Sequence, residues 1–218
     1  SKKEIDFFKI GYAPLKSNFY ESLKNKFSEN EIKNSGIYFY DEKNKKYLDR
    51  FRSRIIFPFK NLTNATIALA GRAISNTTYA KYINSPETEF YKKGSNLYNI
   101  CNVKKLNQSS EEVFILEGYM DVISLTKFGI NNVVANMGTA LTERQLDLIW
   151  RFFKYPIICL DGDKSGKNAS VRAAERLFPF IKSGHSIYFL NLPENKDPDS
   201  YIHQYGKNSF LDLSKNKK

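Results

Sequence analysis

The sequence predicts an α/β protein in which a mainly parallel, four-stranded sheet is flanked by helices and preceded by a mixed α+β subdomain. Three observations lead to this prediction. From about residue 109 onward, short apolar runs alternate with helical patterns, an order typical of βαβ units. The region before it is irregular and contains a hairpin pattern. The length of 218 residues and the hydrophobic content of 41% allow two small cores.

The α+β subdomain is predicted to span residues 1–108. Its expected elements are a helix at about 17–28 and strands at about 36–40, 54–59 and 65–70. Along the helix, Phe19, Leu23 and Phe27 recur every four residues and form one apolar face. The last two strands flank a polar turn, which favours a hairpin. Pro58 lies in the first of these two strands, and because proline has no N–H to donate, it favours an edge position or a bulge.

The parallel sheet and its helices are predicted to span residues 109–199. Strands are expected at 113–116, 132–135, 157–160 and 187–190, and helices at about 119–128, 142–153 and 167–182. Thr142 and Gln145 form a capping-box pair at the start of the second helix. Residues 200–218 are predicted to begin a C-terminal helical region that is cut short, so we expect the chain to be a piece of a longer protein.

Acidic side chains follow three of the predicted strands. The carboxylates concerned are those of Glu117, Asp121, Asp161, Asp163, Asp197 and Asp199. Because the carboxyl ends of parallel strands meet at one edge of a sheet, we expect the six side chains to converge there. Crowded carboxylates repel unless a cation neutralises them, and this oxygen-only set suits Mg²⁺, with Mn²⁺ as the alternative ion. The pattern predicts metal-dependent phosphoryl chemistry, in which two ions about 4 Å apart assist the attacking and leaving oxygens.

Charge and cysteine content narrow the class of protein further. A net charge of +11 points to a polyanionic partner such as nucleic acid, although the bias toward Lys and Asn is explained equally well by codon usage. The two cysteines, Cys101 and Cys159, show no zinc-ligand spacing. No signal peptide opens the sequence and no apolar run is long enough to span a bilayer, so a cytoplasmic protein is expected.

Several short motifs identify a family. In the second half they are Glu117-Gly-Tyr-Met-Asp121, Gly138-Thr-Ala-Leu-Thr142 and Asp161-Gly-Asp-Lys-Ser-Gly166. In the first half they are Gly11-Tyr-Ala-Pro14, Arg52-Ser-Arg-Ile-Ile-Phe-Pro58, Gly71-Arg72, Lys81-Tyr-Ile-Asn-Ser-Pro-Glu-Thr88 and Lys93-Gly94. In this order along nearly the whole chain, they resemble the catalytic core of bacterial replicative primases of the DnaG type, which contains a Toprim fold. The sequence departs from the family pattern at Ala70 and Ser95, and the second change puts one phosphate contact in doubt.

The resemblance implies a DNA-directed RNA polymerase that uses ribonucleoside triphosphates to make short RNA primers on single-stranded DNA for replication. It implies catalytic roles for Glu117, Asp161, Asp163 and Lys81, and a role for all six acids in binding metal. It places the nucleotide and the template strand near a basic surface that contains Arg52, Arg54, Arg72, Lys81, Tyr82, Asn84 and Lys93. The family's zinc-binding domain, and the C-terminal domain that docks on the replicative helicase, have no counterpart in this sequence.

Two other classes of protein remain open from the residues alone. The first is another Toprim enzyme, either a Mg²⁺-dependent nuclease or a topoisomerase. A topoisomerase needs a nucleophilic Tyr on a separate DNA-gating domain, for which 218 residues leave no room, and a nuclease has no use for the motif at 81–88. The second is a module that binds single-stranded DNA by its charge and catalyses nothing.

Overall fold

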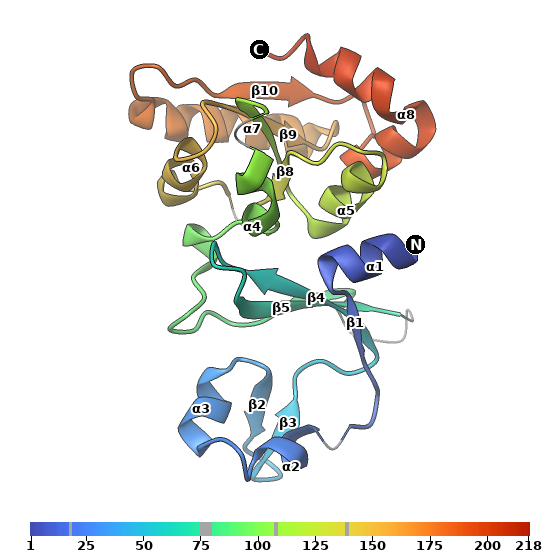
Figure 1. Cartoon of the computed structure of the whole chain (residues 1–218), viewed down its shortest axis with the longest axis vertical. Coiled ribbons are helices and arrows are strands. Elements are labelled where there is room, and N and C mark those ends of the chain that lie inside the picture. Colours follow the sequence, from blue (N-terminus) through green and yellow to red (C-terminus); the bar gives the residue numbers. More distant parts are fainter. Residues whose placement is uncertain (18, 75–79, 107–108, 138–139) are drawn as a thin grey trace. The chain divides into compact units, whose positions relative to one another are not determined.

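The computed structural model describes residues 1–17, 19–74, 80–106, 109–137 and 140–218. It divides into two compact units, unit 1 (Ser1–Lys92) and unit 2 (Lys93–Lys218) (Figure 1). Within the described ranges no helix is both long and apolar enough to cross a membrane. The predicted motif at 138–142 lies partly outside the described residues, because Gly138 and Thr139 are not among them.

Unit 1 is built around an antiparallel sheet of strand order β1-β4-β5-β6, with a second hairpin formed by β2 and β3. Its elements are α1 (Lys2–Phe8), β1 (Gly11–Ala13), α2 (Phe19–Leu23), α3 (Glu29–Asn34), β2 (Tyr38–Asp41), β3 (Lys46–Asp49), β4 (Arg54–Lys60), β5 (Thr66–Ala73) and β6 (Tyr82–Asn84). The hairpin predicted at 54–59 and 65–70 is confirmed as β4 and β5. The large rings Phe59 and Tyr91 are almost fully buried and pack 5.0 Å apart, which fixes a core for this unit.

The helix predicted at 17–28 is wrong in its extent, because α2 ends at Leu23 and a separate helix, α3, begins only at Glu29. The break has a local cause at Ser28, whose backbone is extended and whose side chain accepts from the backbone N–H of Glu31. The Glu31 carboxylate in turn accepts from the backbone N–H of Ser28 at 2.7 Å, so the pair forms a capping box that starts a new helix. The apolar spacing of Phe19, Leu23 and Phe27 therefore does not extend into one continuous helix.

Pro58 lies where a missing N–H is tolerated. Strand β4 has β5 along one side, but on the other side β1 pairs only with Arg54, Ile55 and Ile56. Pro58 is thus beyond the end of β1, and a register shift follows directly at Phe59 and Lys60. Both features match the prediction of an edge position or a bulge for this proline.

Unit 2 is a parallel sheet of strand order β10-β9-β7-β8 with helices packed on it. Its elements are η1 (Lys93–Ser95), α4 (Ile100–Val103), η2 (Lys104–Leu106), β7 (Glu112–Leu116), α5 (Tyr119–Lys127), β8 (Val133–Ala135), α6 (Glu143–Trp150), β9 (Tyr155–Leu160), α7 (Lys164–Leu177), η3 (Phe178–Phe180), β10 (Tyr188–Asn191) and α8 (Pro198–Ser214). The predicted α/β class, with four parallel strands flanked by helices after an α+β region, is confirmed.

The helices divide between the two faces of this sheet. The chain runs from β7 outward to β8, then returns past β7 to β9 and continues to β10. With right-handed crossovers, this reversal puts α5 on one face and both α6 and α7 on the other. Helix α8 packs against α5, and Figure 1 shows these two helices together on the right of unit 2, with α6 and α7 to their left. The sheet is consequently buried on both sides, as its apolar strands require.

The predicted capping box at Thr142 and Gln145 is confirmed and does more than start α6. The Thr142 hydroxyl accepts from the backbone N–H of Gln145 at 3.2 Å. The Gln145 side-chain amide is fully buried and donates to the carbonyls of Lys93 and Asn96, at 2.9 and 2.8 Å. This buried amide therefore fixes the backbone that carries Lys93, one of the residues predicted to bind nucleotide or template.

Candidate functional site

The acidic residues lie at the carboxyl edge of the parallel sheet. Glu117 directly follows β7, and Asp161 directly follows β9, which is the parallel neighbour of β7. The order in which strands are added to the sheet reverses here, since β8 lies on one side of β7 and β9 on the other. Ligands of open α/β sheets bind in the crevice that such a reversal creates. Glu117 and Asp161 therefore stand at the position in this fold where a ligand is best accommodated.

The turn at 161–163 is fixed by close backbone packing. Asp163 caps α7, and its side chain accepts from the backbone N–H of Gly166 at 2.7 Å. Helix α7 therefore begins at Lys164, earlier than the predicted 167, and Gly166 lies in its first turn rather than before it. A β-carbon on Gly166 would lie 2.0 Å from the carbonyl oxygen of Asp161. Position 166 therefore requires glycine, because any side chain there would clash with the Asp161 backbone.

A second glycine joins this turn to the segment that leads into α8. The backbone N–H of Gly162 donates to the carbonyl of Lys196 at 2.7 Å. A β-carbon at Gly162 would lie 2.0 Å from the carbonyl oxygen of Pro193. The absence of a side chain at 162 thus lets the 193–196 backbone approach, which brings Asp197 toward Asp161.

The segment Asp197-Pro198-Asp199 starts helix α8. Asp197 is the N-cap of α8, where its carboxylate accepts from the backbone N–H of Ser200 at 2.6 Å. Pro198 takes the first helical position, where its missing N–H costs nothing. Asp199 lies in the first turn, where the helix dipole stabilises a negative charge.

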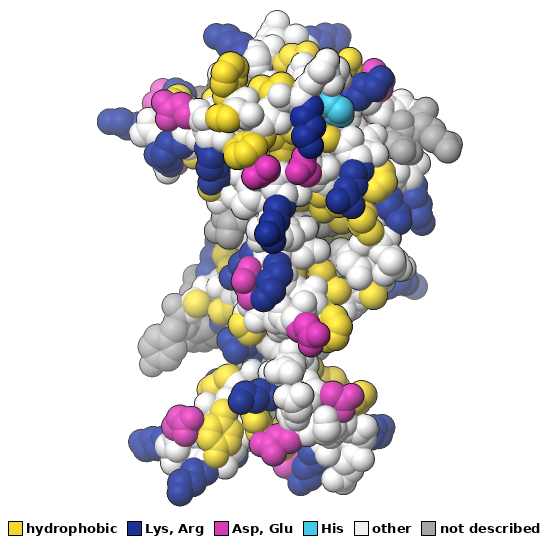
Figure 2. Space-filling view, turned by 90° about the vertical axis from the view of Figure 1, so that its left-hand side faces the viewer, with side chains coloured by type: hydrophobic (Ala, Val, Ile, Leu, Met, Phe, Trp, Pro, Cys, Tyr) yellow, Lys and Arg dark blue, Asp and Glu magenta, His cyan; other side chains and the backbone are white. Residues whose placement is uncertain are grey.

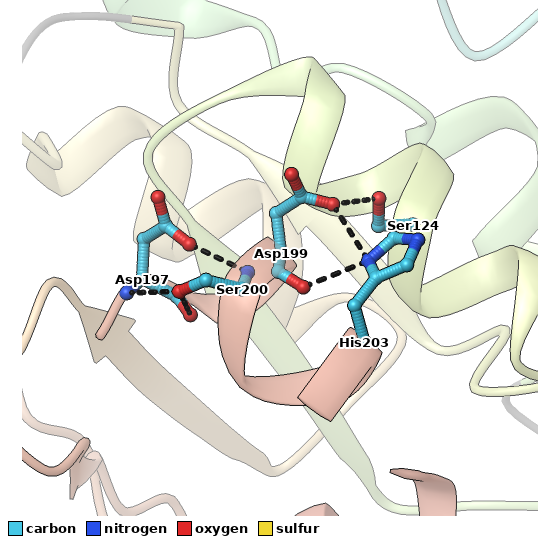
Figure 3. Close-up of polar contacts among 5 residues, drawn as sticks. All are labelled: Ser124, Asp197, Asp199, Ser200 and His203. Carbon is cyan, nitrogen blue, oxygen red and sulfur yellow. Dashed lines mark hydrogen bonds and ion pairs between the residues drawn. The ribbon is translucent and has the colours of Figure 1, made fainter. Parts of the chain in front are cut away.

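Asp199 has two side-chain partners that the sequence did not indicate. Its Oδ1 accepts from the Ser124 hydroxyl of α5 and lies 3.1 Å from Nδ1 of His203 (Figure 3). Asp199 and His203 are four residues apart on one helix face, a spacing that could have identified this pair. The Ser124 contact joins residues 75 apart in sequence and gives no local signal. The Ser124 contact therefore ties α5 to the start of α8.

The carboxylates interact electrostatically as one cluster. Burial raises the pKa of Asp121 to about 7, and the charges of Asp197, Asp161 and Asp199 add to this shift. Burial, followed by the charges of Glu117, Asp197 and Asp163, raises the pKa of Asp161 to about 6. The pKa of Glu117 is also raised, first by burial and then by Asp163. The fold thus brings each of the six predicted acids within electrostatic reach of at least one other, at an energetic cost.

This cost makes the cluster suitable for a cation. All the donors are hard carboxylate oxygens, which suit Mg²⁺ and Mn²⁺, and a divalent cation would offset the repulsion that raises the pKa values of Asp121 and Asp161. In the described part of the chain, no three or more Asp, Glu, His or Cys side chains are already arranged as ligands of one ion. Binding a cation here therefore requires some of the carboxylates to turn toward it.

In unit 1, the predicted basic residues differ in their surroundings. Arg54 is only 6% exposed, and its guanidinium donates to the carbonyls of Ala80 at 2.8 Å, Lys81 at 3.3 Å and Gly71 at 3.5 Å. Arg54 thus fixes the backbone that presents Lys81. Arg52 is exposed, with its guanidinium 6.0 Å from the centre of the Phe39 ring. Figure 2 shows Lys and Arg side chains spread over the visible surface, with fewer acidic side chains among them.

Tyr82 forms the centre of a small cationic and aromatic cluster in unit 1. Its ring is 44% exposed and lies 5.5 Å from Nζ of Lys81 and 5.9 Å from the guanidinium carbon of Arg72. Arg72 pairs with Tyr82 across β5 and β6. Asn84 follows on the same strand, so it shares a face with Tyr82. Its buried Oδ1 has no hydrogen-bond partner among the described residues.

Two protein-family models match the chain. The DNA primase catalytic core, N-terminal domain, matches residues 1–104, and the Toprim-like family matches residues 114–202. Over 215 residues the chain is 38% identical to the DNA primase of Pasteurella multocida, covering 96% of this chain and 36% of that protein. The corresponding values for the DNA primase of Escherichia coli K12 are 34% identity, 96% and 36%. The chain thus spans 36% of the length of these two curated relatives.

Solved structures of primase catalytic domains have the same fold as this chain. The E. coli primase catalytic core matches all of this chain with a TM-score of 0.93 and 32% identity, and the match covers 69% of that chain. A DnaG primase catalytic domain solved bound to single-stranded DNA matches with a TM-score of 0.91 and 32% identity, over 68% of that chain. With the motifs in family order and the acidic sheet edge within the Toprim-like match, the chain belongs to the DnaG-type DNA primases, of whose catalytic core it forms a part.

Proposed function

We propose that this chain carries the nucleotidyl-transfer centre of a primase that synthesises RNA primers on single-stranded DNA. The observation that carries the proposal is that three acidic segments follow strands of the parallel sheet near the point where its strand order reverses, and that their charges act on one another. Carboxylates that are kept close despite raised pKa values are typical of functional sites. The curated relatives are DNA primases, which favours this activity over a nuclease or a binding module.

The acids divide into two groups in this proposal. Glu117, Asp161 and Asp163 would be the principal ligands of Mg²⁺ or Mn²⁺, and Asp121, Asp197 and Asp199 would hold a further ion or, through it, the triphosphate. The bound cation would supply charge neutralisation at the phosphates. The primer 3′-hydroxyl would attack the α-phosphate of a ribonucleoside triphosphate, and pyrophosphate would leave. The protein residues contribute position and electrostatic stabilisation, so no covalent intermediate with the protein is needed.

The template strand is proposed to bind the basic residues of unit 1. Arg52, Arg72 and Lys81 can contact phosphates, and the exposed ring of Tyr82 offers a surface on which a base can stack. Arg54 would act indirectly, because its guanidinium donates to the backbone carbonyls of Ala80 and Lys81 and so fixes the segment that carries Lys81. The single-stranded DNA in one related structure supports the choice of ligand.

We also propose roles for Lys81, Asn84 and Lys93, a partner protein and a cellular location. Lys81 would assist catalysis by placing its charge on a phosphate, Asn84 would bind nucleotide or template through its unpartnered Oδ1, and Lys93 would contact phosphate from the η1 segment. The whole protein would also meet the replicative helicase. We propose that it acts in the cytoplasm, where bacterial replication takes place.

Primer synthesis tests the proposal directly. The chain is incubated with single-stranded DNA, labelled ribonucleotides and Mg²⁺ or Mn²⁺, with EDTA as the control and Asp161→Asn as the variant. We expect template-dependent RNA that disappears with EDTA and in the variant, while circular dichroism of the variant is unchanged. Metal-dependent loss of the DNA without any RNA would instead establish a nuclease, and RNA synthesis by Asp161→Asn at the normal rate would overturn the role of the acids.

A further inference from the structure

We propose that Ser124 and His203 are positioning residues that hold the Asp199 carboxylate in the orientation that binds a divalent cation. This inference rests on the proposed function, in which Asp199 helps to hold a further ion. It adds two residues that take no part in the acidic cluster themselves, and it specifies which oxygen of Asp199 remains for the ion.

Both partners act on the same oxygen of Asp199. The Ser124 hydroxyl donates to Oδ1, and Nδ1 of His203 lies 3.1 Å from that oxygen. Among the described residues, no hydrogen bond or ion pair ends on Oδ2. Figure 3 shows the second carboxylate oxygens of Asp197 and Asp199 pointing to the same side of α8. Asp199 therefore has one oxygen held by the protein and one available to a cation, which predicts binding through a single oxygen.

The two donors are themselves held in place. Nδ1 of His203 also lies 2.9 Å from the backbone carbonyl of Asp199, so both of its neighbours are acceptors and Nδ1 must carry the proton. The His203 ring packs edge-on against Phe128 at 5.1 Å. Ser124 is only 6% exposed on α5. Because Ser124 is buried and His203 is also held by the Asp199 carbonyl and Phe128, the two donors favour one direction of the Asp199 carboxylate.

The acidic cluster gives a reason why Asp199 needs such support. Its charge contributes to the raised pKa of Asp121, so the two carboxylates lie close enough to repel. Asp199 is 43% exposed and, without donors, would lower its energy by turning toward water and away from the cluster. Hydrogen bonds from Ser124 and His203 offset this tendency before any ion arrives. Groups that orient metal ligands in this way commonly change metal affinity by about 10-fold to 100-fold when removed.

Binding of Mn²⁺, followed by electron paramagnetic resonance, tests the inference without relying on activity. The complete chain is compared with Ser124→Ala, His203→Ala, His203→Asn and Asp199→Asn. Asparagine at 203 keeps an N–H donor near the position of Nδ1, so it should recover most of the lost affinity. His185→Ala is the matched control, since His185 packs on Trp150 and contacts the Ser183 carbonyl. Thermal unfolding shows whether each variant is folded, and the exposed His203 variants should fold even if the buried Ser124→Ala does not.

We expect Ser124→Ala and His203→Ala each to weaken Mn²⁺ binding by about 10-fold, with His203→Asn and His185→Ala close to the wild type. In primer synthesis, the same two variants should need more Mg²⁺ for half-maximal rate but approach the normal rate at saturating Mg²⁺. If Asp199→Asn weakens binding while folded His203→Ala does not, the positioning role is wrong and the proposed metal site stands. If Asp199→Asn also binds Mn²⁺ normally, Asp199 is no ligand and both assignments are overturned together.

Discussion

The backbone N–H of Gly162 donates to the carbonyl of Lys196 at 2.7 Å, and this one hydrogen bond joins two acidic segments that are far apart in sequence. It places the turn that carries Asp161 and Asp163 beside the residue that precedes Asp197. A larger residue at 162 would force the two backbones apart, because its β-carbon would lie 2.0 Å from the Pro193 carbonyl oxygen. The geometry of the acidic cluster therefore depends on a position that has no charge and no side chain.

Gly162→Ala should consequently reduce both stability and primer synthesis. The backbone of the 193–196 segment must shift to admit the methyl group, which we expect to cost about 2 kcal/mol or more. Denaturant unfolding measures the loss. Gly11→Ala is the matched control, since a β-carbon there would meet nothing within 4 Å. Equal stability of the two variants would show that the 193–196 backbone yields easily and does not fix the cluster.

The stability of the metal-free chain should fall as the pH rises. The folded state raises the pKa of Asp121 from 3.8 to about 7, so it binds more protons than the unfolded chain in this interval. The associated stability is fully present below 3.8 and is lost as the pH rises through about 7. Asp161, with its pKa raised to about 6, acts in the same direction.

Thermal unfolding between about pH 5 and pH 8 checks this prediction. Asp121→Asn should flatten the dependence, and added Mg²⁺ should raise the Tm more at the higher pH, where the carboxylates are charged. A Tm that rises with pH through this interval in the metal-free chain, and is unaffected by Asp121→Asn, would contradict the burial and repulsion assigned to Asp121.

The acidic edge was accessible to sequence reasoning because strands and their ends leave local signals. The apolar runs before Glu117 and Asp161 correspond to β7 and β9, and the parallel order then requires these residues to share an edge. The helix start at Asp197 also left a signal, an Asp cap followed by Pro, although the helical region was predicted to begin only at 200. In contrast, the Ser124–Asp199 contact exists only once α8 packs on α5, so no local pattern could predict it.

The role of Arg54 shows the same limit in unit 1. Its motif suggested a phosphate ligand, but its acceptors are carbonyls at 71, 80 and 81, which come close only after β4, β5 and the segment before β6 have assembled. The sequence could give the residue type and its strand. It could not show that the guanidinium is buried.

Arg54→Lys should therefore destabilise the fold, even though it keeps the charge. A lysine cannot reproduce the planar fork that reaches several carbonyls, and we expect a loss of about 3 kcal/mol from charged hydrogen bonds. Arg52→Lys, two residues away on an exposed side chain, should change stability by less than about 0.5 kcal/mol. Denaturant unfolding compares the two variants. A stability loss in Arg52→Lys but not in Arg54→Lys would contradict the structural role of Arg54.

Lys81→Gln should weaken binding of single-stranded DNA and make it less dependent on salt. Each phosphate contact contributes about 0.7 to the slope of log K against log salt for single strands, so the slope should fall by about that amount. Fluorescence anisotropy over a salt series gives both values. Lys215→Gln, which removes a lysine paired with Asp212 at 2.6 Å, should leave the slope unchanged. An identical slope in Lys81→Gln and wild type would remove Lys81 from the template surface.

The central claim is that the carboxyl edge of the parallel sheet binds the catalytic cation, and anomalous scattering from crystals soaked in Mn²⁺ tests it most directly. We predict a Mn²⁺ peak in contact with the carboxylates of Glu117 and Asp161, which is lost in crystals of Asp161→Asn. A peak held by other residues, with none at this edge in a chain that still makes primers, would contradict the account.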